Sequence, residues 1–202
     1  MLHFTQRFLQ AIASEKHNMD KDLEKKLFES RVIIVGGYID SDVAGYVVLR
    51  LLQMSAESDT DEIQMFIGSV SGNYLDVLAI YDTMRSLSNP ISGTGIGAVG
   101  NYAAILLAGC NKGSRCCLCH CKFSLEQPYG SLKTGSNQQT EIAIAASEVR
   151  LERETMESLL ALHTGKSVDD IHNDLEFGIE LNAEQAKEYG LIDFIIGSPN
   201  EE

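Results

Sequence analysis

Apolar residues follow two spacings along the chain, one typical of strands and one typical of helices. Short β-branched runs bounded by glycine or polar residues indicate buried strands, and apolar positions three to four residues apart indicate helices. The predicted strands are Arg31–Gly37, Glu62–Gly68, the start of Pro90–Gly109, Arg115–Leu125 and Leu191–Ile196, with a turn expected at Ser69–Asn73. The predicted helices are Val43–Ala56, Tyr74–Leu87, the end of Pro90–Gly109, Gln139–Leu162, Val168–Leu175 and Ala183–Tyr189.

The alternation of strands and helices predicts an α/β fold, with a mainly parallel sheet and helices on its faces. The long helix Gln139–Leu162 has no compact partner in the sequence, so we expect it to project and to pack against another subunit. Residues 1–30 are expected to be largely helical. Phe4, Phe8, Leu9 and Ile12 share one face of a helix over residues 1–13, which could dock on its own core or on a partner.

Composition narrows the class of protein. A chain of 202 residues with 44% hydrophobic and 22% charged residues is typical of one soluble globular domain. The formal net charge of -13 argues against binding to nucleic acid or to anionic membranes. There is no run of eighteen apolar residues, so no membrane span is expected. The N-terminus lacks the pattern of a secretion signal, and the five cysteines are then expected to be reduced thiols. We therefore expect the cytoplasm, or an organelle stroma if a targeting segment has been removed.

The stretch Pro90–Gly109 is predicted to form a strand, a glycine-rich turn and a helix of small residues. Within it, Gly95–Gly100 matches the dinucleotide fingerprint G-x-G-x-x-G. The match is weak, because this turn would follow the third strand, and only Glu126 stands near the position of the expected acidic residue. Small residues that let a helix pack closely on a sheet are the simpler interpretation, and dinucleotide binding stays an alternative.

Inside the predicted strand Arg115–Leu125, the six residues 116–121 include four cysteines and one histidine. A zinc site normally needs two separated pairs of ligands, whereas this is a single group. In a strand, Cys117, Cys119 and Cys121 would share one face, with Cys116 and His120 on the other. We expect small apolar residues in a strand and no metal site, and leave metal binding and redox activity open.

The tip of the predicted strand-to-helix turn is Asn101. Such a turn is where many hydrolases expose a nucleophile, but asparagine has neither a hydroxyl nor a thiol. A serine nucleophile elsewhere would need a base and an orienting acid. No histidine stands beside an obvious serine turn in the sequence. The histidines are His3, His17, His120, His163 and His172.

Several motifs occur together in an order typical of one family. They are Leu78–Met84, Leu106–Arg115, Gln127–Pro128, Leu160–Gly165 and Ala183–Asp193. On these motifs, residues 23–197 resemble the proteolytic subunit of the Clp protease (ClpP). The resemblance implies a crotonase-like α/β fold of stacked ββα units, with a handle at about residues 127–163 that joins two seven-membered rings. Residues 1–22 form a divergent N-terminal segment without a recognisable counterpart of the family's axial hairpin, and residues 198–202 form a tail.

The resemblance also locates the catalytic positions, and this sequence departs from the family at each. The serine of the family's triad corresponds to Asn101, the histidine before Gln-Pro to Glu126, and the aspartate to Gly178. The family's oxyanion hole corresponds to the backbone amides of Gly72 and Tyr102. With all three triad members replaced, the family's ATP-dependent serine endopeptidase activity is not expected. We expect the Asn101 amide to hydrogen-bond to the Glu126 carboxylate.

The sequence therefore predicts a non-catalytic, ClpR-type subunit with a structural or regulatory role. Its expected partners are ClpP-family paralogues in heptameric rings, with a Clp AAA+ ATPase and polypeptide substrates as further partners, and no cofactor. One alternative is an active endopeptidase with Ser71 or Ser124 as nucleophile and Glu126 as base. The other is a dinucleotide-binding protein that uses Gly95–Gly100.

Overall fold

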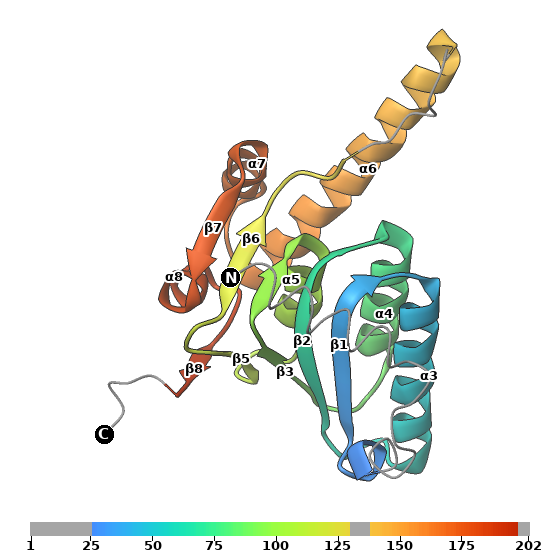
Figure 1. Cartoon of the computed structure of the whole chain (residues 1–202), viewed down its shortest axis with the longest axis vertical. Coiled ribbons are helices and arrows are strands. Elements are labelled where there is room, and N and C mark those ends of the chain that lie inside the picture. The colour runs from blue at the N-terminus through green and yellow to red at the C-terminus, as the bar shows by residue number, and fades with distance from the viewer. Residues whose placement is uncertain (1–25, 130–137, 198–202) are drawn as a thin grey trace.

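The computed structural model describes residues 26–129 and 138–197, which form two sheets with helices around them (Figure 1). The larger sheet is fully parallel, and the smaller one contains an antiparallel pair. In spatial order, the larger sheet consists of β1 (Val32–Ile39), β2 (Ile63–Gly72), β3 (Ile91–Gly95), β5 (Arg115–Leu118) and β8 (Phe194–Ile196). The smaller sheet consists of β4 (Ala98–Gly100), β6 (Lys122–Leu125) and β7 (Ile179–Asn182).

Most of the described helices begin at a residue whose side chain caps the helix, and α5, which follows Gly100, is an exception. The helices are α3 (Ser41–Glu57), α4 (Tyr74–Ser86), α5 (Asn101–Ala108), α6 (Gln139–Thr164), α7 (Val168–Phe177) and α8 (Ala183–Tyr189). The Asp40 side chain accepts a hydrogen bond from the Val43 N–H at 2.9 Å, and Asn73 and Ser167 cap α4 and α7 in the same way. These caps satisfy N–H groups that have no acceptor inside the helix.

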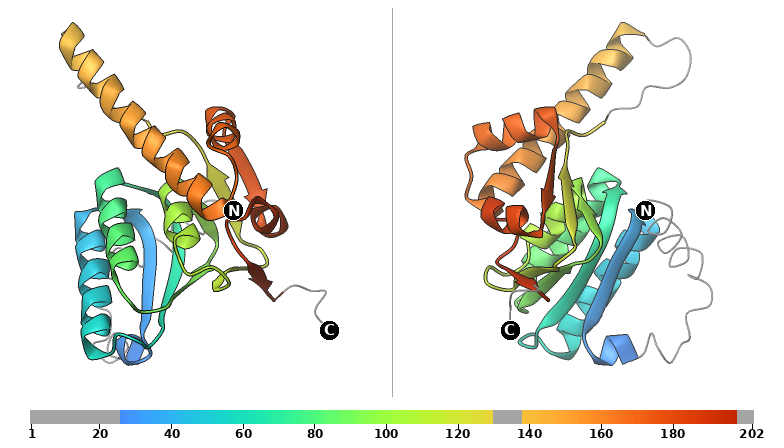
Figure 2. Two further views of the ribbon diagram at one scale, coloured as in Figure 1. Left: turned by 180° about the vertical axis from the view of Figure 1, so that it is seen from behind. Right: turned by 60° about the vertical axis from the view of Figure 1, so that its left-hand side comes forward.

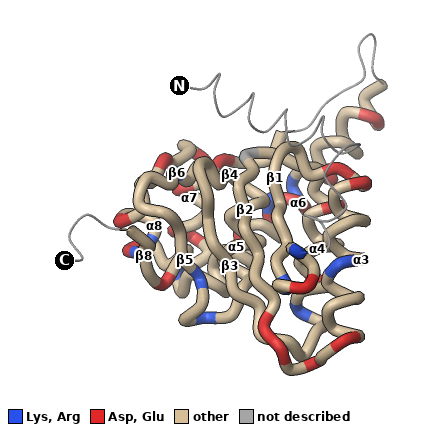
Figure 3. Tube along the Cα trace, turned by 60° about the horizontal axis from the view of Figure 1, so that its bottom comes forward, with Lys and Arg blue, Asp and Glu red and all other residues tan. Residues whose placement is uncertain are grey.

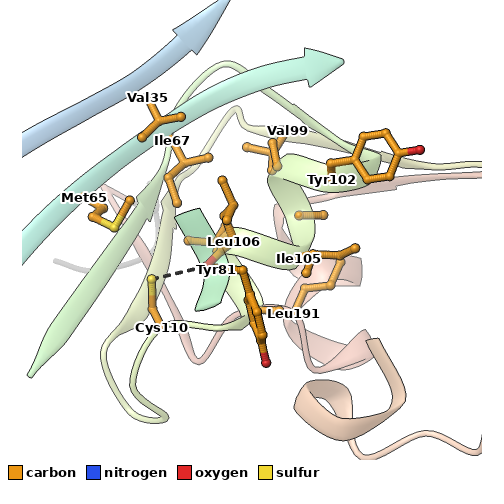
Figure 4. Close-up of a cluster of buried hydrophobic side chains, with 14 of the residues drawn as sticks. Val35, Met65, Ile67, Tyr81, Val99, Tyr102, Ile105, Leu106, Cys110 and Leu191 are labelled. Atoms are coloured by element: carbon orange, nitrogen blue, oxygen red, sulfur yellow. Dashed lines mark hydrogen bonds between the residues drawn. The ribbon is translucent and has the colours of Figure 1, made fainter. Parts of the chain in front are cut away.

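The main core lies between the larger sheet and helices α3, α4 and α5, which lie on one side of that sheet (Figures 1 and 2). Val35, Met65 and Ile67 point from β1 and β2 toward Ile105 and Leu106 of α5 (Figure 4). Seven of the eight residues of α5 are buried, as expected for a helix that is apolar on all sides. The rigid packing around α5 fixes its first residue, which is the tip of the strand-to-helix turn.

The structure differs from our predictions about strands in four places. Arg115–Leu125 is two strands in two sheets, because the chain turns at the hydrogen bond from the Cys121 N–H to the Leu118 carbonyl, 2.9 Å long. Ser69–Asn73 is not a turn, since β2 continues to Gly72 through its pairing with β1. Strand β7 was not predicted, and the last strand starts three residues later than expected. The mixed α/β architecture itself is confirmed.

Helix α6 projects from the body, as we predicted (Figures 1 and 2). Its buried residues all lie in its C-terminal half: Met156, Glu157 and Leu160. Its N-terminal half exposes the apolar side chains of Ile142, Ile144 and Leu151. Its 26 residues correspond to a length of about 39 Å. Residues 1–22, the loop 130–137 and the tail 198–202, for which we also made predictions, lie outside the described residues.

Acidic and basic side chains lie mainly on the helices and turns, and few lie on the strands of the larger sheet (Figure 3). The exception is Arg115 on β5, which is 3% exposed and forms an ion pair of 2.6 Å with Asp193. This pair ties β5 to the segment that leads into β8. None of the described helices is long and apolar enough to cross a membrane.

Candidate active site

The strand-to-helix turn places Asn101 at the junction of β4 and α5. Gly100, the N-cap residue of α5, is extended, and Asn101 follows it with a φ of +40°. Few side chains tolerate this left-handed region, and asparagine is one of them. A strained residue at a sharp strand-to-helix turn is the backbone geometry of a nucleophile elbow. The turn has this shape, but its side chain is an amide.

Asn101 and Glu126 meet, as we predicted, but not through the atoms that we predicted. The backbone N–H of Glu126 donates a hydrogen bond of 2.7 Å to the amide oxygen of Asn101. The Glu126 carboxylate instead accepts a hydrogen bond from the hydroxyl of Tyr129, and this bond raises the pKa of the Tyr129 phenol. Glu126 is only half-buried, so its carboxylate does not depend on the Asn101 amide for a partner. The predicted contact is therefore corrected to one with the Glu126 backbone.

Gly178 lies against the side chain of Glu126. A Cβ atom built on Gly178 would be 3.5 Å from the Glu126 Cγ. Gly178 follows α7 with φ +69° and ψ 132°, a conformation that favours glycine. The fold thus brings together the three positions that the sequence comparison matched to a triad. The first position carries the amide of Asn101, and the second carries the Glu126 carboxylate, which is hydrogen-bonded to the Tyr129 hydroxyl. The third position is glycine and has no side chain.

A cavity of about 430 Å³ opens beside Glu126 and Gly178. It is lined by Glu126, Gln127, Tyr129, Leu175, Glu176, Phe177, Gly178, Ile179 and Glu180. No histidine, cysteine or serine lines it. A serine-type reaction needs a nucleophile next to an imidazole or an equivalent base. The cavity offers only carboxylates and a phenol for such roles.

The two predicted backbone donors lie near this turn. Tyr102 is the second residue of α5, so its N–H is among those without an acceptor inside the helix. Gly72 ends β2, and the Tyr74 ring two residues later lies 6.2 Å from the Tyr102 ring. The Tyr102 hydroxyl donates to the Glu152 carboxylate of α6, which links this turn to the projecting helix. The pairing of Gly72 and Tyr102 as an oxyanion hole stays a prediction.

Neither serine of the alternative mechanism has a histidine partner among the described residues. Ser71 lies on β2 next to Tyr38, and Ser124 lies on β6 between Gly100 and Glu180. The side chain of Ser71 is exposed, and that of Ser124 is half-buried. Within residues 26–129 and 138–197, neither hydroxyl is hydrogen-bonded to a base. The structure gives this alternative no support.

Two of the described histidines, His163 and His172, are engaged elsewhere, and His120 is exposed in the turn between β5 and β6. His3 and His17 lie outside the described residues. His163 Nε2 is 2.7 Å from the Tyr81 hydroxyl, and burial lowers the pKa of His163 to about 4, so the imidazole is neutral. His172 Nδ1 is 2.8 Å from the Glu157 carboxylate. Neither lies among the residues that line the cavity.

The His172–Glu157 pair belongs to a polar network that sequence reasoning missed. Arg153 donates to Glu157 at 2.7 Å, to Glu176 at 2.6 Å and to Gln127 at 3.2 Å. The network joins α6, α7 and the segment after β6, and two of its members line the cavity. The spacing of Arg153 and Glu157, four residues apart on one helix, was the only signal in the sequence.

The glycines of Gly95–Gly100 pack the fold and do not form a phosphate cradle. Gly95 ends β3 in one sheet, and Gly100 ends β4 in the other. A Cβ atom on Gly95 would be 3.2 Å from both the Cys117 Cβ and a methyl carbon of Leu107. A dinucleotide site needs a glycine turn that leads directly from one strand into a helix. Here a second strand intervenes, so the geometry gives no support to dinucleotide binding.

The cysteines do not share one strand face, so our prediction for them is wrong. The chain turns at residues 118–121, so Cys117 lies on β5 and Cys121 precedes β6, and the turn brings these two thiols together as hydrogen-bond partners. All five cysteines are free, and Cys119 alone is not buried. Burial raises the pKa of Cys110 to about 12. Among the described residues, no cluster of three or more histidine, cysteine or acidic side chains could hold a metal ion.

Comparisons with known proteins agree with the fold and the motifs. The Clp protease family profile matches residues 15–199. The chain is 37% identical over 177 residues to the ATP-dependent Clp protease proteolytic subunit 1 of Rhodopirellula baltica, which covers 87% of this chain and 77% of that protein. It is 35% identical to the protein of the same name from Thermobifida fusca, over 85% of this chain and 76% of that protein. It is 32% identical to the protein of this name from Salinibacter ruber, over 89% of this chain and 76% of that protein. The chain belongs to the Clp protease family.

Proposed function

We propose that this chain is a non-catalytic subunit of a Clp protease complex, with a structural or regulatory role in the proteolytic ring. The observation that supports the proposal is the arrangement of Asn101, Glu126 and Gly178. These positions adjoin one another as a triad would, yet they provide no hydroxyl, no imidazole and no orienting carboxylate.

The chemistry of these groups favours a site that does not cleave peptides. The amide oxygen of Asn101 accepts the Glu126 N–H, and an amide is not an acyl-transfer nucleophile. Backbone donors at Gly72 and Tyr102 could still hold a peptide carbonyl. Without a nucleophile and a base, donors of this kind retain only a small part of the rate enhancement.

The proposal includes assembly with other subunits. Members of the Clp protease family form oligomeric rings with other ClpP subunits. The N-terminal half of α6 exposes Ile142, Ile144 and Leu151, which a stable monomer would rarely leave uncovered on a projecting helix. We propose heptameric rings that mix this chain with active paralogues, and a Clp AAA+ ATPase as a partner of the assembly. Free thiols at all five cysteines favour the cytoplasm as the compartment.

The catalytic part of the proposal is tested with the purified chain, a fluorogenic peptide and a fluorophosphonate probe for reactive serines. The expected result is no labelling and no turnover above buffer, with an active Clp protease subunit as positive control. Turnover that is abolished by Asn101→Ala would overturn the proposal. Labelling that is lost in Ser71→Ala or Ser124→Ala would overturn it in favour of an unorthodox serine site.

The assembly part is tested separately by co-purification and native mass spectrometry. The expected result is a ring that contains this chain together with at least one other Clp protease subunit. A ring made of this chain alone would contradict the mixed assembly but leave the lack of catalysis standing. A monomer at micromolar concentration would contradict assembly altogether.

A further inference from the structure

Two of the five cysteines face each other where the chain leaves the larger sheet for the smaller one. Cys117 lies on β5, next to Gly95 on β3, and Cys121 directly precedes β6. The hydrogen bond of 2.9 Å from the Cys121 N–H to the Leu118 carbonyl closes the turn between them. The turn folds the chain back, so that the two thiols are hydrogen-bond partners. The pair therefore spans the corner between the two sheets (Figure 1).

A glycine leaves the space in which the two thiols meet. A Cβ atom built on Gly95 would be 3.2 Å from the Cys117 Cβ and 3.4 Å from the Cys121 Sγ. Both side chains thus approach the same point beside β3, where a larger residue would push against them. A disulfide requires two cysteines whose side chains point toward each other. The convergence of Cys117 and Cys121 on Gly95 meets this requirement.

The other three cysteines lie in different surroundings. Cys116 is adjacent to Cys117 in β5, so its thiol points to the opposite face of the strand. Cys110 follows α5, where its thiol donates to a helix carbonyl at 3.4 Å. Cys119, in the turn itself, is partly exposed. The geometry therefore favours a bond between Cys117 and Cys121 over any other pairing within the chain.

The two thiols of the pair are not equivalent. The Cys121 thiol donates a hydrogen bond to the Cys117 sulfur, and this bond lowers the pKa of Cys117 and raises the pKa of Cys121. The thiolate, not the thiol, is the nucleophile in cysteine oxidation. Cys117 is therefore the residue that reacts first with an oxidant, and Cys121 stands where a second, resolving thiol is needed.

We propose that Cys117 and Cys121 form a redox modification site, at which a peroxide oxidises the two thiols to one reversible disulfide. The Cys117 thiolate attacks a peroxide oxygen and the O–O bond breaks, which gives a sulfenic acid on Cys117. The hydroxide that leaves takes up the proton that Cys117 released. The Cys121 sulfur then attacks the Cys117 sulfur, the S–O bond breaks, and the Cys121 proton leaves with the hydroxide as water. Two electrons thus pass from two thiols to one molecule of hydrogen peroxide, which becomes two molecules of water.

Burial restricts which reagents reach the pair. Cys117 and Cys121 are 0% and 2% exposed, so bulky thiol reagents are excluded, whereas hydrogen peroxide needs only a small opening of the turn at residues 118–121. The disulfide joins β5 to the residue before β6, and a methyl carbon of Leu107 on α5 lies 3.2 Å from the point where the thiols meet. Oxidation would therefore fix the corner between the two sheets beside α5. In a reducing compartment, such a disulfide is expected to be transient.

The test follows each cysteine of the full chain by differential alkylation. The chain is exposed to hydrogen peroxide and then unfolded in light iodoacetamide and dimedone, which block free thiols and isolated sulfenic acids. Reduction and heavy iodoacetamide then mark only the cysteines that were in disulfides. Trypsin releases residues 116–122 as one peptide, because it cleaves after Arg115 and Lys122, and fragmentation reads the label on each cysteine. We expect heavy label on Cys117 and Cys121 in equal amounts and light label on the other cysteines. Dithiothreitol added before unfolding should remove the heavy label.

Two serine variants separate this pair from its neighbour in the turn. Cys121→Ser should abolish the heavy label on Cys117 and leave a dimedone adduct there, because the sulfenic acid has no second thiol to attack it. Cys119→Ser, the matched control, should leave the heavy label on Cys117 and Cys121 unchanged. Cys121→Ala replaces Cys121→Ser if circular dichroism shows that the serine variant does not fold. Light label on both thiols after peroxide, heavy label on Cys119, a disulfide between two chains, or an unchanged heavy label on Cys117 when Cys121 is replaced would overturn the proposal.

Discussion

The hydrogen bond between the Glu126 N–H and the Asn101 amide oxygen predicts a measurable loss of stability when that oxygen is removed. The two atoms are 2.7 Å apart, and Asn101 holds a φ of +40°. A part-buried N–H that loses its partner costs about 1–3 kcal/mol. Alanine in the left-handed region costs about 1–2 kcal/mol more. Asn101→Ala should therefore lower the free energy of unfolding by about 2–5 kcal/mol.

Asn101→Asp is the matched control, because aspartate keeps an oxygen at the same position and also tolerates a positive φ. Its free energy of unfolding should stay within about 1 kcal/mol of that of the unaltered chain. Urea unfolding followed by circular dichroism measures both values, provided that the dependence on urea is the same in all three proteins. If Asn101→Asp is as destabilised as Asn101→Ala, or if neither changes, then the amide oxygen does not hold this turn together. In that case Asn101 would have no structural role to explain its presence at the tip.

The other predictions concern buried ionisable groups and the backbone at Gly178. Asp193→Asn should cost about 3–5 kcal/mol in urea unfolding, because it leaves the Arg115 guanidinium buried without its carboxylate. Burial alone would raise the pKa of Asp193, but hydrogen bonds from Arg115 and nearby backbone amides lower it. Its contribution to stability should therefore be present above about pH 3.8 and be lost as the pH falls further. His163 has a pKa of about 4 when folded, below its ordinary 6.5, because of burial, so unfolded chains bind more protons between these values. Stability should fall as the pH falls from 6.5 to 4, and His163→Gln should flatten this slope in thermal melts at several pH values; an unchanged slope would contradict the assignment. Gly178→Ala should cost about 1–3 kcal/mol because of its φ of +69°, although the nearest atom to the added Cβ is 3.5 Å away. Gly45→Ala in α3, where φ is ordinary and no atom is within 4 Å, should be neutral or slightly stabilising, and equal losses at the two glycines would refute the backbone argument.

Much of the fold follows from local patterns in the sequence. The apolar spacing in α3, α4 and α6, and the short β-branched runs of β1 and β2, predicted these elements within a few residues. The apolar pattern did not predict strands whose position depends on pairing with residues far away in the sequence. Residues 115–125 are small and apolar throughout, so periodicity does not show that the chain leaves one sheet and enters another. Strand β7 is four residues long and exists because β6, more than fifty residues earlier, offers it an edge.

The candidate site was likewise predictable from local motifs, but not where it depends on contacts between distant elements. Motif comparison placed Asn101, Glu126 and Gly178 at matching positions, and the fold brings them together. Motif comparison could not predict that the Glu126 backbone N–H would donate a hydrogen bond to the Asn101 amide oxygen. This contact depends on the register between β4 and β6 and on the φ of Asn101. The polar network around Arg153 was invisible for a similar reason, since its members come from three separate elements.

The strand order of the larger sheet has a consequence for synthesis of the chain on the ribosome. Strand β8 comes from the end of the described chain and pairs with β5, and Asp193, which reaches Arg115, is 78 residues further along. At about 5–20 residues per second, translation of this interval takes roughly 4–16 s. During that time the edge of β5 is unpaired and the Arg115 guanidinium has no carboxylate. The sheet is therefore completed only when nearly the whole chain has emerged, and the nascent protein must keep an apolar edge from other chains until then.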